Sequence, residues 1–426
     1  MWTNWSGGQQ GHPVATVRPL DETGVRAAVR RAAGRGHRLR PVGAGHSFSP
    51  LAVTDEVALE LSALTGVVRC DGDRVRARAG TTLAELNTAL TERGLSLAAF
   101  GDIDTPTLAG AVATGMHGSS AATGSLSAQV TGVRLIDGTG AAVEVGAAEL
   151  DAARTGLGAI GVVTEVELSV RPQYVLRLTQ DRLPLAEALS REFLDGHAWA
   201  EFWVFPYAGH ALTRYADEVS EPEPPTRAGT VRSLERRLVR SAAVGGGVAL
   251  GRTVPKLVPA LNRAATRLAR SSSVTGEITD LAHRALLARP VVRWEESEWA
   301  LPRAALADGV RSLLDAIATA GLEVGFPLEV RVGPAETGWL HPAYGRDTGW
   351  VAVHIAAGTD PEPLSRLVTE VLGAHGGRPH WAKRHPWTND EVAAAYPKLA
   401  EFRAVRDRHD PHRVFASPYL DSLLGT

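Results

Sequence analysis

The chain has 426 residues, of which 44% are hydrophobic and 22% charged, and its formal net charge is −2. This balance is typical of a folded protein of two or three domains, and the near-neutral charge gives no reason to expect a nucleic-acid partner. Cys70 is the only cysteine, which excludes a disulfide within the chain and a cysteine-based zinc site. The first residues show neither the basic nor the apolar region of a signal peptide, so we expect a cytoplasmic protein without membrane contact.

Between residues 14 and 172, short predicted strands alternate with helices. In chain order these are a helix over Thr23–Gly34, strands at Arg38–Val42, Val57–Leu61 and Arg74–Arg78, a helix over Thr82–Arg93, and strands at Val130–Ile136 and Val162–Val170. Thr82 and Glu85 form a capping pattern at the start of the second helix, and Gly94 ends it. The pattern predicts an α+β domain over residues 1–172.

A second domain is predicted over residues 173–395, and a C-terminal segment over residues 396–426. Alternating residues predict strands at Glu201–Tyr207, Phe326–Val332 and Trp350–Ala356, and the last segment carries a helix over Leu399–Arg408. Residues 227–270 contain ten Lys and Arg but one acidic residue. A basic stretch of this kind can contact a membrane surface or an acidic partner, although a solvated helical face is the simpler interpretation.

The segment Pro41–Pro50, which reads Pro-Val-Gly-Ala-Gly-His-Ser-Phe-Ser-Pro, is the most informative part of the chain. Its glycines allow a tight turn whose N–H groups can hold a pyrophosphate, and His46 follows directly. The turn lacks both the Lys-Ser/Thr of a Walker A loop and the G-x-G-x-x-G of the usual dinucleotide fingerprint. By itself it is equally compatible with an ordinary glycine turn and a solvated histidine.

Two further glycine-rich segments favour a bound ligand. Residues 101–118 are crowded with small residues, which let the backbone lie against a large flat molecule, whereas a core strand would use Val and Ile. Residues 156–163 read Gly-Leu-Gly-Ala-Ile-Gly-Val-Val, a tight turn that enters a strand. The fourteen histidines show no H-E-x-x-H spacing, so we expect no metal site.

Together these segments closely resemble the FAD-linked aldonolactone oxidoreductases of the vanillyl-alcohol-oxidase superfamily. The resemblance covers nearly the whole chain and extends to Glu296–Pro302, Pro327–Arg331, Ala343–Asp347, Arg378–Lys383 and Asp410–Phe415. It implies an α+β, two-domain flavoprotein with a PCMH-type FAD-binding domain, a sheet-and-helix substrate (cap) domain, and a C-terminal segment that returns to the FAD domain. Two departures are Met116, where the family usually has threonine, and Ala382, where many relatives have glycine.

The resemblance also implies roles for individual residues in binding FAD. His46 corresponds to the histidine that is often bonded covalently to the flavin. The other cofactor-binding residues implied are Val42, Gly43, Ala44, Gly45 and Ser47 in the turn, Gly101, Asp102, Thr107, Gly110, Ala113, Thr114, Gly115 and His117 along the flavin, and Gly161 and Val163 near the adenine.

On the substrate side we predict Glu329, Arg331, His354 and Lys383 as catalytic residues. Glu329 and Arg331 are two residues apart on a predicted strand, so they share a face and can orient a polyol or lactone. Such a pair is usually a surface salt bridge, but apolar neighbours favour a functional role here. His354 is the candidate base, with a structural histidine as an equal alternative, and Lys383 is the candidate cation near flavin N1. Glu296 and Glu298, in a Trp-rich stretch, are further candidates for the pocket, although a position outside it is the favoured interpretation.

The residue at the position of Gly101 lies near the reactive edge of the flavin in the family, where oxidases tend to carry glycine and dehydrogenases alanine. Gly101 therefore favours access of oxygen. Asp102 stands where alditol oxidases resemble one another in having serine, which favours a lactone over an open-chain alditol.

The sequence thus predicts oxidation of a sugar 1,4-lactone at the hydroxyl next to the carbonyl, with reoxidation by O2 or an electron-acceptor protein. An alditol oxidase, or an oxidase of a secondary metabolite, is the nearest alternative. A flavin-binding protein without redox chemistry, which contacts a membrane or partner through residues 227–270, is a third.

Overall fold

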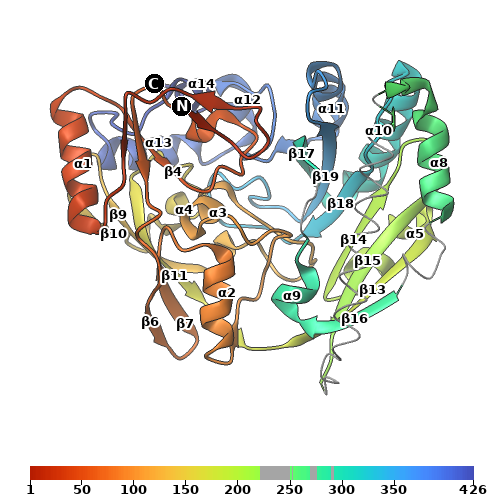
Figure 1. Ribbon diagram of the computed structural model, residues 1–426, viewed down its shortest axis with the longest axis horizontal. Coiled ribbons are helices and arrows are strands. Elements are labelled where there is room, and N and C mark those ends of the chain that lie inside the picture. Colours follow the sequence, from red (N-terminus) through yellow and green to blue (C-terminus); the bar gives the residue numbers. More distant parts are fainter. Residues whose placement is uncertain (221–249, 252, 269–275, 289–291) are drawn as a thin grey trace.

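The computed structural model describes residues 1–220, 250–251, 253–268, 276–288 and 292–426 (Figure 1). The first part of the chain and the C-terminal helices lie on the left of Figure 1, and a large sheet with its covering helices lies on the right. The predicted boundary at residue 172 falls between β12 (Arg171–Pro172) and β13 (Val175–Pro184). Most of the basic stretch 227–270 is outside the described residues. Every helix within the described ranges is too short or too polar to cross a membrane.

A small parallel sheet holds the glycine turn. Its strand order is β3 (Ala15–Val17), β5 (Val57–Glu60), β4 (Leu39–Val42), and α1 (Glu22–Gly34) connects β3 to β4. Asp21 caps α1 by accepting a hydrogen bond of 2.8 Å from Gly24 N, and the apolar face of the helix is buried. The bounds of α1, β4 and β5 agree with the predicted ranges to within one residue at each end. β4 ends at Val42, so the turn begins at the edge of this sheet.

A five-stranded antiparallel sheet lies beside the small parallel sheet. The strand order of this second sheet is β10 (Ala142–Glu144), β9 (Val130–Ile136), β11 (Val162–Ser169), β7 (Arg74–Arg78), β6 (Val67–Asp71). At the start of the chain, the short strands β1 (Trp2–Thr3) and β2 (Gln10–Gly11) pair with each other. The capping box predicted from Thr82 and Glu85 is present at α2 (Leu83–Thr91), which ends two residues before the predicted Arg93. The small-residue run contains α3 (Leu108–Thr114), followed by α4 (Leu150–Ala153), while β8 (Leu95–Ser96) pairs with β12.

The large sheet has eight antiparallel strands. Its order is β16 (Gly276–Leu281), β13, β15 (His210–Glu218), β14 (Trp199–Val204), β18 (Leu328–Gly333), β19 (Thr348–Ala356), β17 (Trp294–Pro302), β20 (Arg378–Pro379). The predicted strand 201–207 in fact ends at Val204, because Pro206 lacks an N–H donor and Tyr207 has φ of +68°. The predicted strand 326–332 begins at Leu328, after Pro327.

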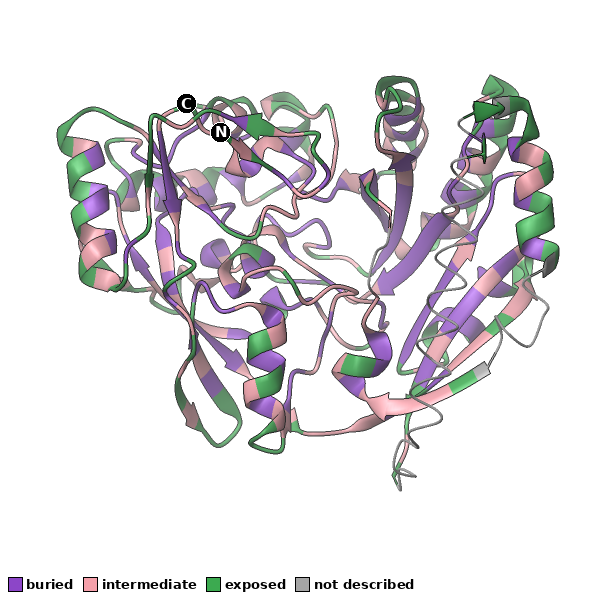
Figure 2. Cartoon of the chain, viewed as in Figure 1, coloured by how far each residue is buried: buried purple, intermediate pink, exposed green. Residues whose placement is uncertain are grey.

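One face of this sheet is apolar and the other carries charged side chains, so only the second can form a polar site. Figure 2 shows that its central strands are buried. One face is apolar and packs against α10 (Leu306–Ala320) and α11 (Glu362–Ala374). The other face carries Glu201 on β14 and charged residues at alternate positions of β17 and β18, because side chains alternate along a strand. The smaller helices of this part are α5 (Leu185–Ala188), α6 (Arg191–Asp195), α8 (Val258–Leu268) and α9 (Ala282–Leu286).

The C-terminal segment packs against the first parallel sheet. It contains α12 (Asn389–Ala395), α13 (Leu399–His409) and α14 (Pro418–Leu424). Leu39 N donates a hydrogen bond of 2.7 Å to Val414 O, and Phe415 shares a core with α1 and β4. Asp410 accepts bonds of 2.7 and 2.8 Å from the N–H groups of Val414 and Phe415, which fixes the turn after α13. The tail therefore supports the strand that leads to the glycine turn.

Candidate active site

A cavity of about 550 Å³ lies between the glycine-rich segments and the charged face of the large sheet. All four predicted catalytic residues line it, as do all but two of the predicted cofactor-binding residues: Val42, Gly43, Ala44, Gly45, His46, Ser47, Asp102, Thr107, Gly110, Ala113, Thr114, His117, Gly161 and Val163. Gly101 and Gly115 do not line this cavity. Gly101 borders a second, much smaller one, and Gly115 faces His341.

The glycine turn presents bare backbone to the cavity. A Cβ atom added to Gly43 would lie 2.6 Å from Thr107 Oγ1, so a side chain here would fill the space between the turn and α3. Gly45 has φ of +72°, which L side chains rarely adopt. Asn4 Nδ2 donates a hydrogen bond of 2.9 Å to Ser47 O and so ties the chain's start to the turn. These features fit the phosphate-holding role predicted for a bound FAD.

His46 is held by two contacts that the sequence did not predict. Its Nε2 lies 2.8 Å from Thr105 Oγ1, and its ring stacks on Trp5 with centroids 5.7 Å apart. Burial, and then the positive charge of Lys383, lowers the pKa of His46, so the ring is neutral at physiological pH. A neutral imidazole can act as a nucleophile, since its unprotonated nitrogen carries a lone pair.

Arg40 also lines the cavity and was missed. Its buried guanidinium donates four hydrogen bonds to backbone carbonyls: to Leu51 at 3.1 Å, Gly158 at 3.2 Å, Leu157 at 3.1 Å and Phe415 at 3.0 Å. No carboxylate among the described residues pairs with it, and burial lowers its pKa to about 10. Arg40 therefore joins the glycine turn's strand, the 156–161 turn and the C-terminal tail.

The opposite wall carries Glu329 and Arg331, which share a face of β18 as predicted. Arg331 donates to Glu329 Oε1 from Nε at 3.2 Å and from Nη2 at 2.7 Å. His354 on β19 places Nε2 3.8 Å from Glu329 Oε2, and Trp294 packs edge-on against its ring. Burial, with the negative charge of Asp102, raises the pKa of Glu329 despite the attraction of Arg331. Glu329 and His354 can therefore accept a proton as a pair.

Lys383 lies between two acidic residues, Glu296 and Glu298. Its Nζ is 2.7 Å from Glu296 Oε1 and 3.8 Å from Glu298 Oε2, and both glutamates line the cavity. Burial acts to lower the pKa of Lys383, but the two carboxylates outweigh it and raise the pKa, so Lys383 is a cation. Glu296 and Glu298, the less favoured candidates for the pocket, thus line the cavity with Lys383. Their spacing of two on a strand, like that of Glu329 and Arg331, was the signal that could have included them.

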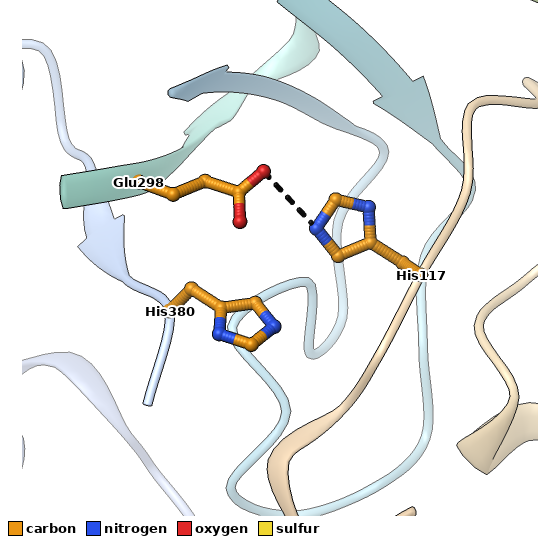
Figure 3. Close-up of side chains that lie close together, drawn as sticks. All are labelled: His117, Glu298 and His380. Atoms are coloured by element: carbon orange, nitrogen blue, oxygen red, sulfur yellow. Dashed lines mark ion pairs between the residues drawn. The ribbon is translucent and has the colours of Figure 1, made fainter. Parts of the chain in front are cut away.

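Glu298 also meets two histidines, as Figure 3 shows. His117 Nε2 lies 3.4 Å from Glu298 Oε1, while His117 Nδ1 donates a bond of 2.9 Å to Gly118 O and the ring stacks on Trp350. His380 completes the group. Its Nδ1 accepts a hydrogen bond from Ala382 N, so the proton of the neutral ring is on Nε2, which makes Nε2 a donor rather than a metal ligand. The group stabilises an ionised Glu298: burial acts to raise its pKa, but His117 and Lys383 lower it well below the ordinary value.

Comparisons with known proteins agree with this architecture. The family model described as "D-arabinono-1,4-lactone oxidase" matches residues 166–423, and one described as "FAD binding domain" matches residues 13–146. The L-gulono-1,4-lactone dehydrogenase of Mycobacterium tuberculosis is 37% identical over 100% of this chain and 99% of its own. An alditol oxidase of a Streptomyces strain is 31% identical over 99% and 98%.

A solved structure supports the fold. A cholesterol oxidase from B. sterolicum superposes with a TM-score of 0.82 at 19% identity, covering 99% of this chain and 96% of that one. At this identity the likeness concerns the fold alone. Because a family model spans more than half of the chain, and a relative at 37% identity spans all of it, the chain belongs to the D-arabinono-1,4-lactone oxidase family of FAD-dependent oxidoreductases.

Proposed function

We propose that this protein uses FAD to oxidise a sugar 1,4-lactone, of the L-gulono- or D-arabinono- type, at the hydroxyl next to the carbonyl. The observation that carries the proposal is the set of the buried Glu329 and Arg331 and the half-buried His354 and Lys383, which faces the glycine turn across one cavity. The names of the relatives support the substrate class. The alditol oxidase at 31% identity keeps an open-chain polyol as the alternative.

Each side chain has a distinct part in the reaction. Arg331 donates hydrogen bonds to a carbonyl or hydroxyl oxygen of the substrate, and the pair Glu329 and His354 accepts the hydroxyl proton as the carbonyl forms. FAD, when bound, supplies the hydride acceptor. Lys383 places a cation beside the region where negative charge then develops. The substrate thus loses a hydride and a proton, and its secondary alcohol becomes a ketone.

The test is anaerobic reduction of the flavin. L-gulono-1,4-lactone, D-arabinono-1,4-lactone and xylitol are each mixed with the oxygen-free protein while the visible flavin absorbance is followed. We expect the lactones, and not xylitol, to bleach it. Bleaching by xylitol alone would favour the alditol oxidase, and bleaching by none of them would reject the proposed substrate class.

We further propose that FAD is bonded covalently to His46. His46→Ala is then expected to give folded protein whose flavin is released by acid precipitation, whereas the parent protein keeps its flavin in the pellet. The neutral, oriented ring of His46 supports this role. The exposed His37 provides a matched control, since His37→Ala removes a histidine that does not line the cavity. Flavin that stays covalently bound in His46→Ala would reject the assignment.

The position of Met116 beside Gly101 bears on which acceptor reoxidises the flavin. A Cβ atom on Gly101 would overlap the Met116 methyl group, so Met116 fills the space that the glycine leaves open. We therefore propose that O2 has limited access and that an external acceptor is preferred. Met116→Ala is expected to speed reoxidation by air severalfold after anaerobic reduction. An unchanged rate would mean that Met116 does not control access, and Gly101 would then favour an oxidase as the sequence suggested.

A further inference from the structure

Arg331 is held from behind by a glutamate that does not reach the cavity. Glu201 on β14 is fully buried, and its Oε2 lies 3.3 Å from Arg331 Nε. Its other oxygen, Oε1, lies 2.7 Å from Nη2 of Arg214 on β15. Glu201 and Arg214 are directly opposite in the β14–β15 register, and β14 is also the neighbour of β18. The two residues therefore form a charged row that leads to Arg331.

Asp102 contacts both guanidinium groups, so that Glu201, Arg214, Asp102 and Arg331 form a closed set of ion pairs, which we call the charged ring. Its carboxylate forms an ion pair with Arg331 Nη2 and lies 3.6 Å from Arg214 Nη2. Asp102 and Glu201 thus each bridge the same two guanidinium groups, one from the loop before α3 and one from the sheet. Arg214 is fixed further by the rings of Trp199 at 4.6 Å and Trp203 at 5.3 Å.

The ring determines which atom of Arg331 is left for a ligand. Glu201 and Glu329 contact Nε, while Glu329 and Asp102 contact Nη2. Within the described residues no bond is made by Nη1, although Arg331 lines the cavity. A guanidinium that is clamped along one edge presents its remaining nitrogen in a fixed direction.

The charges of the ring are also informative. Together with Glu329, which pairs with Arg331, the charged ring has three carboxyl groups, on Asp102, Glu201 and Glu329, and two guanidinium groups, on Arg214 and Arg331. Burial raises the pKa of both Glu201 and Glu329, although the guanidinium groups of Arg214 and Arg331 act to lower it. One proton held among the three carboxyl groups would balance the charges, and Glu329 is the carboxyl whose Oε2 lies 3.8 Å from His354.

We propose that Glu201 and Arg214 are positioning residues that act through Arg331: they hold its Nη1 towards the substrate and set the affinity for a substrate with an acceptor oxygen at that point. This inference rests on the proposed function for the identity of the substrate. Neither residue lines the cavity, so neither touches the substrate. Their effect must therefore disappear when Arg331 is absent.

The test is a double-mutant cycle with Glu201→Gln and Arg331→Ala in the FAD-loaded protein. Glu201→Gln keeps the shape of the side chain but places an amide where a carboxylate faces two guanidiniums. We expect the KM for the lactone to rise about tenfold or more, as for loss of a hydrogen bond to a charged group, with a smaller change in kcat and unchanged flavin content. In the Arg331→Ala background the same substitution is expected to leave KM unchanged.

Two further variants separate positioning from general damage. Glu167→Gln removes a buried, ion-paired glutamate of the five-stranded sheet, outside the cavity, and is expected to leave KM unchanged. Arg214→Lys tests the same ring from its far end and replaces Glu201→Gln if that variant does not fold. Equal effects of Glu201→Gln with and without Arg331, or no effect in either, would overturn the inference.

The inference can fail separately from the proposed function. If no lactone reduces the flavin of the parent protein, the proposed function has failed. The same cycle is then measured on thermal unfolding, which needs no substrate. If Glu201 acts on Arg331 through the charged ring, the effects of Glu201→Gln and Arg331→Ala on stability must be non-additive. Additive effects would reject the inference.

Discussion

Replacing Lys383 by methionine is expected to slow anaerobic flavin reduction by the lactone by about 10²–10³-fold, which is typical for loss of one group that stabilises charge in a transition state. Methionine keeps much of the side chain's length but removes the only ammonium group that we find on the cavity wall within the described residues. Glu296 would lose the Lys383 ammonium group, which lies 2.7 Å from its Oε1, and its carboxylate would stay unpaired near the reacting atoms. Stopped-flow measurement of the flavin absorbance gives the rate directly.

Flavin content and folding distinguish this effect from loss of the cofactor. We expect Lys383→Met to keep its FAD, since the glycine turn that holds the phosphates is a separate wall of the cavity. Lys398→Met is the matched control, because Lys398 pairs with Glu401 on the surface away from the cavity. A reduction rate within a factor of two of the parent's would remove Lys383 from the mechanism.

Replacing Arg40 by methionine is expected to cause the largest loss of stability, roughly 3–6 kcal/mol. Three of the four carbonyls that the guanidinium satisfies are buried, and that of Gly158 is partly buried. An unsatisfied buried polar group costs about 1–3 kcal/mol unless water replaces its partner. The three segments joined by Arg40 would also separate. Chemical denaturation of the parent and variant proteins, each with its flavin bound, measures the change in the free energy of unfolding.

Arg40→Lys and Arg35→Met complete this experiment. Lysine keeps the charge but cannot direct planar donors to four carbonyls, so we expect an intermediate loss. Arg35 follows α1 and is exposed, so its replacement is expected to change stability by less than about 0.5 kcal/mol. If Arg40→Met proves as stable as Arg35→Met, the carbonyl bonds do not hold the three segments together.

Local patterns predicted the elements near the glycine turn well. The helix at α1 and the capping box of α2 depend on residues within one or two turns of the chain, and both are formed as predicted. The errors lie where proline or a positive φ overrides alternation, as at Pro206 and Tyr207, and where a helix ends early, as α2 does. Such endings depend on local backbone limits and on packing that alternation alone does not encode.

By itself, the sequence predicted which segments line the cavity. The glycine turn and the pair Glu329 and Arg331 could be found because their spacing fixes the local backbone direction. The roles of His46 and Lys383 came instead from the resemblance to a known family. Only the tertiary structure decided how these groups are supported. Thr105 beside His46, Arg40 beneath the turn, and the ring of Glu201, Arg214 and Asp102 around Arg331 join residues up to 375 positions apart. No periodicity reports such contacts, because burial and the pairing of strands, rather than nearness in the chain, bring those side chains together.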